Sequence, residues 1–210
     1  MEMRFSSQTS LNDFLSAIAS AEDAHGTVSA VAYAAAMGTS LLLMVAALPK
    51  TRSDSADDRA VLMKCATALR NLQQQLLETI ETETAVKVFA ARAMPAASQS
   101  QRTERDAAIQ LALRAAADVP LEVMRLSALA LRQAELVAAR GCLAASSDIQ
   151  SAVALLRLAS DGARANLESK LSSLTDVLYT ASVVDEVSRL SEEATATARS
   201  AEQLIQPPPA

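Results

Sequence analysis

Apolar positions recur along most of the chain with the spacing of amphipathic helices. Near the N-terminus four of them fall at i, i+3, i+4 and i+7, which places them on one helix face: Leu11, Phe14, Leu15 and Ile18. Ser10 and Asp13 form a capping box that predicts the helix start at Ser10. A longer helix is predicted over 57–94, and its buried face carries Leu62, Leu69, Leu72, Leu76 and Ile80.

Between these two helices lies a segment with a different pattern. Residues 28–48 contain no charged side chain, and a run of 21 residues is long enough to span a membrane. The segment is rich in small residues, with seven alanines, and every later predicted helix is amphipathic. We therefore predict the enclosed central helix of a globular bundle, not a membrane span.

Proline, glycine and helix-capping residues divide the remaining chain into predicted elements. Residues 95–101 are predicted to form a loop, and Thr103 with Asp106 predicts the start of a helix that continues to Arg140. A kink or break is expected at Pro120, because proline lacks a backbone donor and clashes with the preceding turn. Gly141 suits the position after a helix end.

The last third of the chain completes the predicted domain. Ser147 and Asp148 are expected to cap a helix that reaches Lys170. A final helix is predicted over 183–205, and residues 207–210 are predicted to form a disordered, proline-rich tail. Residues 1–206 are expected to form one helical domain.

Composition supports an all-α, single-domain helical bundle. Half of the 210 residues are hydrophobic but only 2% are aromatic, and there are four glycines. The core must therefore be built from aliphatic side chains, and glycine-rich nucleotide-binding or β-sandwich folds are disfavoured. The net charge of −5 is mild and dispersed, which together with the scarcity of aromatics argues against nucleic-acid binding.

Several kinds of chemistry find no support in the sequence. Cys65 and Cys142 lie far apart and have no metal-ligand spacing, so two reduced thiols and no metal are expected. Phosphate-binding and dinucleotide-binding glycine motifs are absent, as is a nucleophile elbow. The N-terminus is too polar for a signal peptide, which favours a cytoplasmic protein.

A series of short segments, taken in order, suggests a family. The segments are Phe14-Leu15, Gly26 with Ser29, Gly38, Met44-Val45-Ala46, Val119-Pro120-Leu121-Glu122-Val123, Gly141, Ser147-Asp148 and Asn166. Their order and spacing resemble those of the cyclodeaminase domain of formiminotransferase-cyclodeaminase and of the related methenyltetrahydrofolate cyclohydrolases. The resemblance runs nearly from end to end of the chain.

The resemblance implies a helical homodimer that binds a reduced folate carrying a one-carbon unit. Such enzymes cyclise 5-formimino-tetrahydrofolate or interconvert the methenyl and 10-formyl forms, with the folate as substrate and no separate cofactor. Acid–base chemistry is then expected of Asp148 and His25. Substrate contacts are expected of six further residues: Gly26, Ser29, Lys50, Arg52, Ser147 and Asn166.

The chain departs from the family pattern at polar positions, which predicts an eroded site. Thr27 and Val28 replace two loop glycines, and alanine stands at positions 85 and 144 where the family has polar residues. Two alternatives stay open. The chain could be a relative that binds another pterin or small molecule, or a non-catalytic dimeric interaction protein.

Each candidate side chain also has an ordinary structural role open to it. Ser147 and Asp148 could serve only as helix caps, and Ser29 could bond within its own helix. His25 could be a polar loop residue. Lys50 and Arg52 could be solvated or could neutralise the end of the preceding helix.

Overall fold

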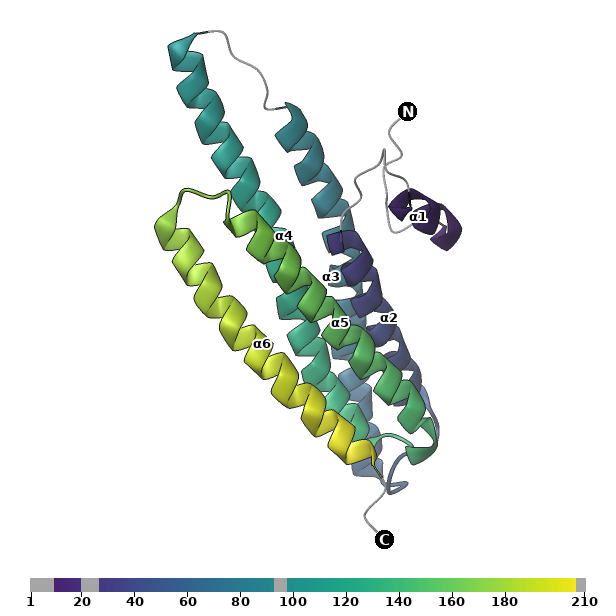
Figure 1. Ribbon diagram of the computed structural model, residues 1–210. Coiled ribbons are helices and arrows are strands. Elements are labelled where there is room, and N and C mark those ends of the chain that lie inside the picture. Colours follow the sequence, from purple (N-terminus) through teal and green to yellow (C-terminus); the bar gives the residue numbers. More distant parts are fainter. Residues whose placement is uncertain (1–9, 20–26, 93–97, 207–210) are drawn as a thin grey trace.

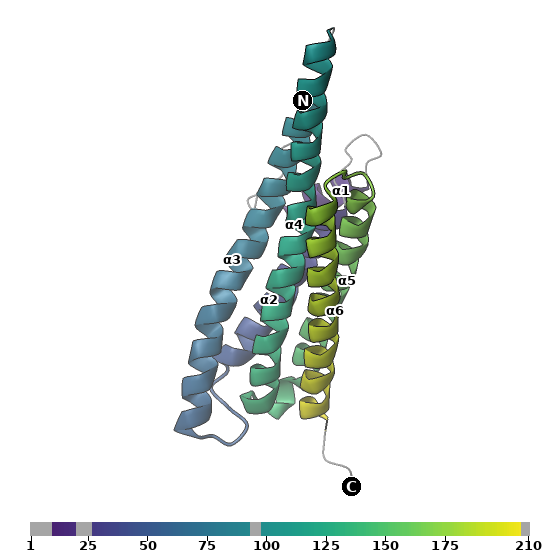
Figure 2. The ribbon, with the colours of Figure 1, turned by 90° about the vertical axis from the view of Figure 1, so that its left-hand side faces the viewer.

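The computed structural model describes residues 10–19, 27–92 and 98–206, and these form an all-helical bundle (Figure 1). Its helices are α1 (Leu11–Ile18), α2 (Thr27–Ala47), α3 (Ala56–Arg92), α4 (Gln99–Arg140), α5 (Ser146–Leu171) and α6 (Val177–Ile205), with a 3₁₀ turn at Leu143–Ala145 before α5. From α2 to α6 successive helices run in opposite directions, and α4 extends beyond α5 and α6 (Figure 2). The predicted all-α fold is confirmed.

The bundle has an upper and a lower end in the orientation of Figure 1. At the upper end α2 begins and α5 ends. At the lower end α2, α4 and α6 end, and the connections at 48–55 and 141–145 lie there. The predicted tail at 207–210 lies outside the described residues, as do residues 95–97 of the predicted loop.

Helix α2 is the core helix that the uncharged segment predicted. It is long and apolar enough to cross a membrane, but 56% of its most apolar window is buried inside the bundle. Thr39 and Ser40 donate their hydroxyls to carbonyls one turn back, at 2.8 and 2.7 Å, so these polar groups are satisfied within the helix. Its neighbours α3 and α5 cover it from two sides, while Met37 and Met44 lie at the surface.

Glycines set the close approach of α2 and α5. A Cβ on Gly38 would lie 2.9 Å from the Ala152 carbonyl oxygen, and one on Gly162 would lie 2.6 Å from Cγ1 of Val31. Both distances are shorter than real Cβ contacts allow. The two antiparallel helices therefore depend on residues without side chains where they touch.

Helix α4 differs from its prediction in two ways. It begins at Gln99, before Thr103, so Thr103 is not its cap and residues 99–101 are helical. It also continues through Pro120 without a break. Proline leaves the carbonyl four residues earlier, that of Ala116, without its usual donor. Lys170 of α5 supplies a substitute, since its Nζ donates to that carbonyl at 3.0 Å.

The cap predicted for α1 is confirmed, whereas the cap predicted for α5 is wrong. The Ser10 hydroxyl accepts from the Asp13 amide at 3.2 Å, as predicted, but of the α1 stripe only Phe14 is buried while Leu11 and Leu15 are exposed. Ser147 and Asp148 lie inside the first turn of α5 and do not cap it, because the preceding 3₁₀ turn moves the helix start to Ser146.

The last helix starts earlier than predicted. Helix α6 begins at Val177 instead of residue 183, because the Asp176 carboxylate accepts from the Tyr179 amide at 3.0 Å and caps it. Helix α3 begins at Ala56, one residue before its predicted start, and its five predicted apolar core positions are all buried. The predicted end at residue 94 lies outside the described residues.

Candidate functional site

The predicted site residues are divided between the two ends of the bundle. Ser29 and Asn166 lie at the upper end, whereas Lys50, Arg52, Ser147 and Asp148 lie at the lower end. Eighteen residues of continuous helix separate Asp148 from Asn166, a distance of about 27 Å at 1.5 Å per residue. His25 and Gly26 lie outside the described residues. A single chain therefore does not bring this set around one small ligand.

At the upper end, Ser29 and Asn166 lie at nearly the same level. Gly162 lies against Val31, and the two helices run in opposite directions from that contact. Ser29 is two residues and Asn166 four residues beyond it, so their heights differ by about 3 Å. Ser29 is buried, and Oδ1 of Asn166 is a buried acceptor with no hydrogen-bond partner among the described residues.

Ser29 and Asn166 lie on different sides of helix α2. Ser29 lies on the same flank of α2 as Ser40, three turns further on, and Ser40 accepts a hydrogen bond from Gln73 of α3 at 2.6 Å. Ser29 therefore faces α3. Asn166 shares a side of α5 with Gly162, the glycine that touches α2.

The Val119–Val123 segment of α4 completes the upper end. Lys170 bonds to Ala116, and one turn below this contact the same two helices present Asn166 and Pro120. The Ser29 hydroxyl, the Asn166 amide and the Lys170 ammonium group thus lie at similar levels of the bundle, but Ser29 faces α3 and Lys170 bonds to α4. Of the three, Asn166 offers a buried acceptor that could receive a hydrogen bond from a ligand.

Lys170 is the residue that sequence reasoning missed. The chain offered a signal for it, since a proline well inside a predicted helix leaves one carbonyl that needs a donor from elsewhere. What the pattern could not supply was the identity of that donor, which comes from a helix 54 residues away.

At the lower end, arginines bind helix C-termini. Arg52 donates to the carbonyls of Ala138 and Leu204 at 2.9 and 2.8 Å, near the ends of α4 and α6. Arg59 donates to the carbonyls of Leu48 and Pro49, both at 2.6 Å, at the end of α2. Guanidinium groups suit this position, because the last carbonyls of a helix lack partners and carry partial negative charge. Arg52 thus serves two helices other than the preceding one.

A buried carboxylate holds the same end together. Asp58, 1% exposed, accepts from the amide and the hydroxyl of Ser53 at 3.0 and 2.6 Å and from Arg140 at 3.0 Å. These bonds, those from Ser53 foremost, hold the pKa of Asp58 below its usual value. Because its oxygens are occupied, Asp58 is a structural anion. Nearby, Lys50 and Ser147 are exposed and Asp148 is half-buried.

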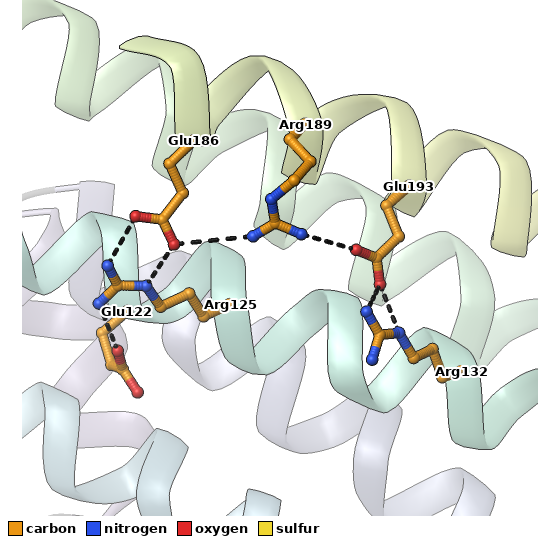
Figure 3. A network of polar contacts seen from close by, with 6 residues as sticks. All are labelled: Glu122, Arg125, Arg132, Glu186, Arg189 and Glu193. Atoms are coloured by element: carbon orange, nitrogen blue, oxygen red, sulfur yellow. Dashed lines mark hydrogen bonds and ion pairs between the residues drawn. The ribbon is translucent and has the colours of Figure 1, made fainter. Parts of the chain in front are cut away.

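Six charged side chains join α4 to α6 (Figure 3). Arg125 bonds both oxygens of Glu186 at 2.8 Å and Glu122 at 3.2 Å, while Glu193 accepts from Arg132 and Arg189. The first of these contacts raises the pKa of Arg125 and lowers that of Glu186. All of them except Glu122 line an open groove of about 250 Å³. Because each acid is paired with an arginine, the groove offers a ligand no unpaired charge.

Metal binding finds no support in the part of the chain that the structure describes. There, no three side chains among histidine, cysteine, aspartate and glutamate stand close enough to hold an ion. The described cysteines are free, and burial raises the pKa of the Cys65 thiol.

Comparisons with known proteins agree on one family. The family model described as formiminotransferase-cyclodeaminase matches residues 10–189. The methenyltetrahydrofolate cyclohydrolase of Methylorubrum extorquens is 32% identical over 193 residues, which cover 84% of this chain and 92% of that protein. The crystal structure of formiminotetrahydrofolate cyclodeaminase from Thermotoga maritima superposes with a TM-score of 0.84 at 18% identity, covering 94% of this chain and 96% of that one. The chain belongs to the formiminotransferase-cyclodeaminase family.

Proposed function

We propose that the chain binds a reduced folate carrying a one-carbon unit and hydrolyses its 5,10-methenyl form to the 10-formyl form. The observation that carries this proposal is the 32% identity to a methenyltetrahydrofolate cyclohydrolase along most of both chains. Cyclisation of 5-formimino-tetrahydrofolate is the second candidate reaction for the same site. It has weaker support, because the similarity to the cyclodeaminase at 18% identity concerns the fold.

The proposed hydrolysis needs few groups. Water adds to the methenyl carbon of the cationic substrate, and a base takes one of its two protons. The bond from that carbon to N5 then breaks as the remaining hydroxyl proton is transferred to N5, which leaves the formyl group on N10 and releases one proton overall. Asp148 or His25 is proposed as that base. Ser29 and Asn166, with Gly26 and Ser147, are proposed to hydrogen-bond the substrate, and Lys50 and Arg52 to attract its carboxylates. The buried, unpartnered Oδ1 of Asn166 supports its part, since ring N–H donors of a pterin would satisfy it.

We further propose that the protein is a cytoplasmic homodimer, as the family resemblance implies. A dimer would also explain how site residues at opposite ends of the bundle could act on one substrate. Within one chain Asp148 lies about 27 Å from Asn166, so Asp148 could act on a substrate held by Asn166 only from a second copy.

The first test is thermal unfolding with and without tetrahydrofolate, 5-formyl- and 5,10-methenyl-tetrahydrofolate. A ligand that binds only the folded protein stabilises it by about 2.7 kcal/mol at 100 times its Kd, which raises the melting temperature visibly. Asn166→Ala should reduce that shift, whereas Asn71→Ala, at an exposed asparagine of α3, should leave it unchanged. No shift with any folate would overturn the proposal and favour another ligand or a protein partner.

Activity is then measured as the loss of the methenyl compound over its uncatalysed hydrolysis. Asp148→Asn is expected to lower kcat while the folate-induced rise in melting temperature persists. A protein that binds folate but does not accelerate hydrolysis or cyclisation would keep the binding proposal and refute the catalytic one.

A further inference from the structure

The turn between α5 and α6 is attached to α4 by side-chain hydrogen bonds. The turn covers residues 172–176 and lies beside α4 at the upper end of the bundle (Figure 1). Gln110 of α4 accepts from the amide and the hydroxyl of Thr175 at 3.0 and 3.1 Å, and it donates to the Ser173 carbonyl at 3.4 Å. One side chain therefore holds both the backbone and a side chain of this turn.

The first turn of α6 is attached to the same part of α4. The Tyr179 hydroxyl donates to Oδ1 of Asp118 at 2.6 Å, and the Arg114 guanidinium lies over the Tyr179 ring, 4.3 Å from its centroid. Arg114 also pairs with Asp176, the cap of α6, at 3.4 Å. Gln110, Arg114 and Asp118 occupy successive turns on one side of α4, and together with Tyr179 they are termed the α4 clasp.

The contacts of this part of the bundle are mostly polar. Between residues 110 and 118 the buried side chains are alanines, and between 172 and 179 none is buried. Leu111, Val177 and Leu178 are exposed, at 63%, 78% and 85%. Apolar contacts have no preferred direction, whereas hydrogen bonds have a preferred distance and angle. The clasp therefore decides how the turn lies on α4.

The clasp lies next to a proposed substrate-binding residue. Asn166 lies five residues before the end of α5, about 7.5 Å along the axis, and its Oδ1 is the buried acceptor without a partner among the described residues. Helix ends open more readily than helix centres, so the position of Asn166 depends on how firmly the turn after α5 is held. Asp118 of the clasp also directly precedes the Val119–Val123 segment.

We infer that the α4 clasp positions Asn166 for the substrate, with Tyr179 and Gln110 as positioning residues of the proposed hydrolysis. The inference rests on the proposed function, because it assigns these residues a role at that site. Neither residue acts as an acid or a base. Burial, and then the bond to Asp118, raise the pKa of Tyr179, so its hydroxyl stays protonated at neutral pH and acts as a donor.

The first measurement is amide hydrogen exchange of the protein without ligand. Tyr179→Phe keeps the ring and removes the hydroxyl bond to Asp118. Exchange in residues 164–171, the last turns of α5, should become about tenfold faster. Ser200→Ala is the matched control, because Ser200 also donates a hydroxyl from α6 to a carboxylate of α4, that of Glu135 at the lower end. It should leave exchange in 164–171 unchanged.

Two substitutions at Gln110 separate its hydrogen bonds from its bulk. Gln110→Met removes the bonds to Thr175 and keeps a side chain of similar length, whereas Gln110→Glu keeps the acceptor oxygen that both bonds use. Gln110→Met should therefore speed exchange at the end of α5. Gln110→Glu should retain most of the protection of the wild type.

Kinetics with 5,10-methenyl-tetrahydrofolate test the link to the substrate. Tyr179→Phe and Gln110→Met should each raise KM about tenfold and change kcat by less than about twofold, because a displaced Asn166 weakens binding without removing the proposed base. The pH dependence of kcat should stay that of the wild type. Ser200→Ala should leave KM unchanged.

Three results would overturn the inference. They are unchanged exchange at the end of α5 in both Tyr179→Phe and Gln110→Met, an equal effect of Ser200→Ala, and faster exchange with an unchanged KM, which would make the clasp structural only. A wild type that neither binds nor hydrolyses a folate would refute the proposed function, and the substrate role of the clasp with it. The exchange measurement would still show whether the clasp holds the end of α5, so the two failures are distinguishable.

Discussion

Replacing Lys170 by methionine removes the donor that serves the Ala116 carbonyl, which Pro120 leaves without its helical partner. A hydrogen bond to a charged group contributes about 1.5–3 kcal/mol, and this one lies in a partly buried contact. We expect Lys170→Met to lower the free energy of unfolding by about 2 kcal/mol. The chain length makes this a shift of roughly 4–8 °C in melting temperature.

The same substitution should cost much less in a Pro120→Ala background. Alanine at 120 has an amide that can donate to the Ala116 carbonyl, as in any regular helix. The carbonyl then no longer depends on Lys170. Other interactions of Lys170 are lost in both backgrounds and cancel, as does the effect of Pro120→Ala by itself, because only the difference between the two costs is compared.

The assay is urea unfolding, followed by circular dichroism, of the wild type, both single variants and the double variant. All four are measured at the same protein concentration, because association would otherwise shift the apparent stability. A coupling of at least about 1 kcal/mol between the two positions is expected. Additive effects would refute the account of why α4 passes through Pro120 unbroken.

Three further substitutions test other contacts. Gly162→Ala should destabilise by about 1–2 kcal/mol in thermal unfolding, because its Cβ would lie 2.6 Å from Val31, although alanine normally stabilises a helix interior; a stabilised variant would contradict the close α2–α5 packing. Arg52→Gln should lower stability by about 1 kcal/mol by releasing two helix C-termini, against no change for the exposed Lys50→Gln; equal stabilities of the two variants would remove this role from Arg52. The pKa of Asp58 is lowered in the folded state, so its contribution is complete above the ordinary pKa of 3.8 and is lost as the pH falls through the folded value. Asp58→Asn should therefore be less stable at neutral pH and lose less stability on acidification; parallel pH profiles would show that the carboxylate is not the sensitive group.

Local pattern by itself determined most of the architecture. The spacing of Leu62, Leu69 and Leu76 indicated both the existence and the buried side of α3, and all three are enclosed. The uncharged run of 21 residues indicated α2 as the core helix. These features depend on which side chains recur every three to four residues, and such periodicity is written directly in the chain.

Motif order was equally informative about the family, and the match over residues 10–189 confirms it. Motif order could not predict where the candidate residues lie in the bundle. Ser29 and Asn166 lie at one end of the bundle while Asp148 lies at the other, because the up-and-down topology alternates the direction of successive helices. Spacing along the sequence does not contain that information.

The tertiary structure decided the points at which a distant group replaced a local one. Pro120 would end an isolated helix, but Lys170 on another helix supplies the missing donor. Arg52 satisfies carbonyls 86 and 152 residues away, and its role follows from where three helices end together. Local rules predict an element when its hydrogen bonds close within it. They failed here where the partners are brought together only by folding.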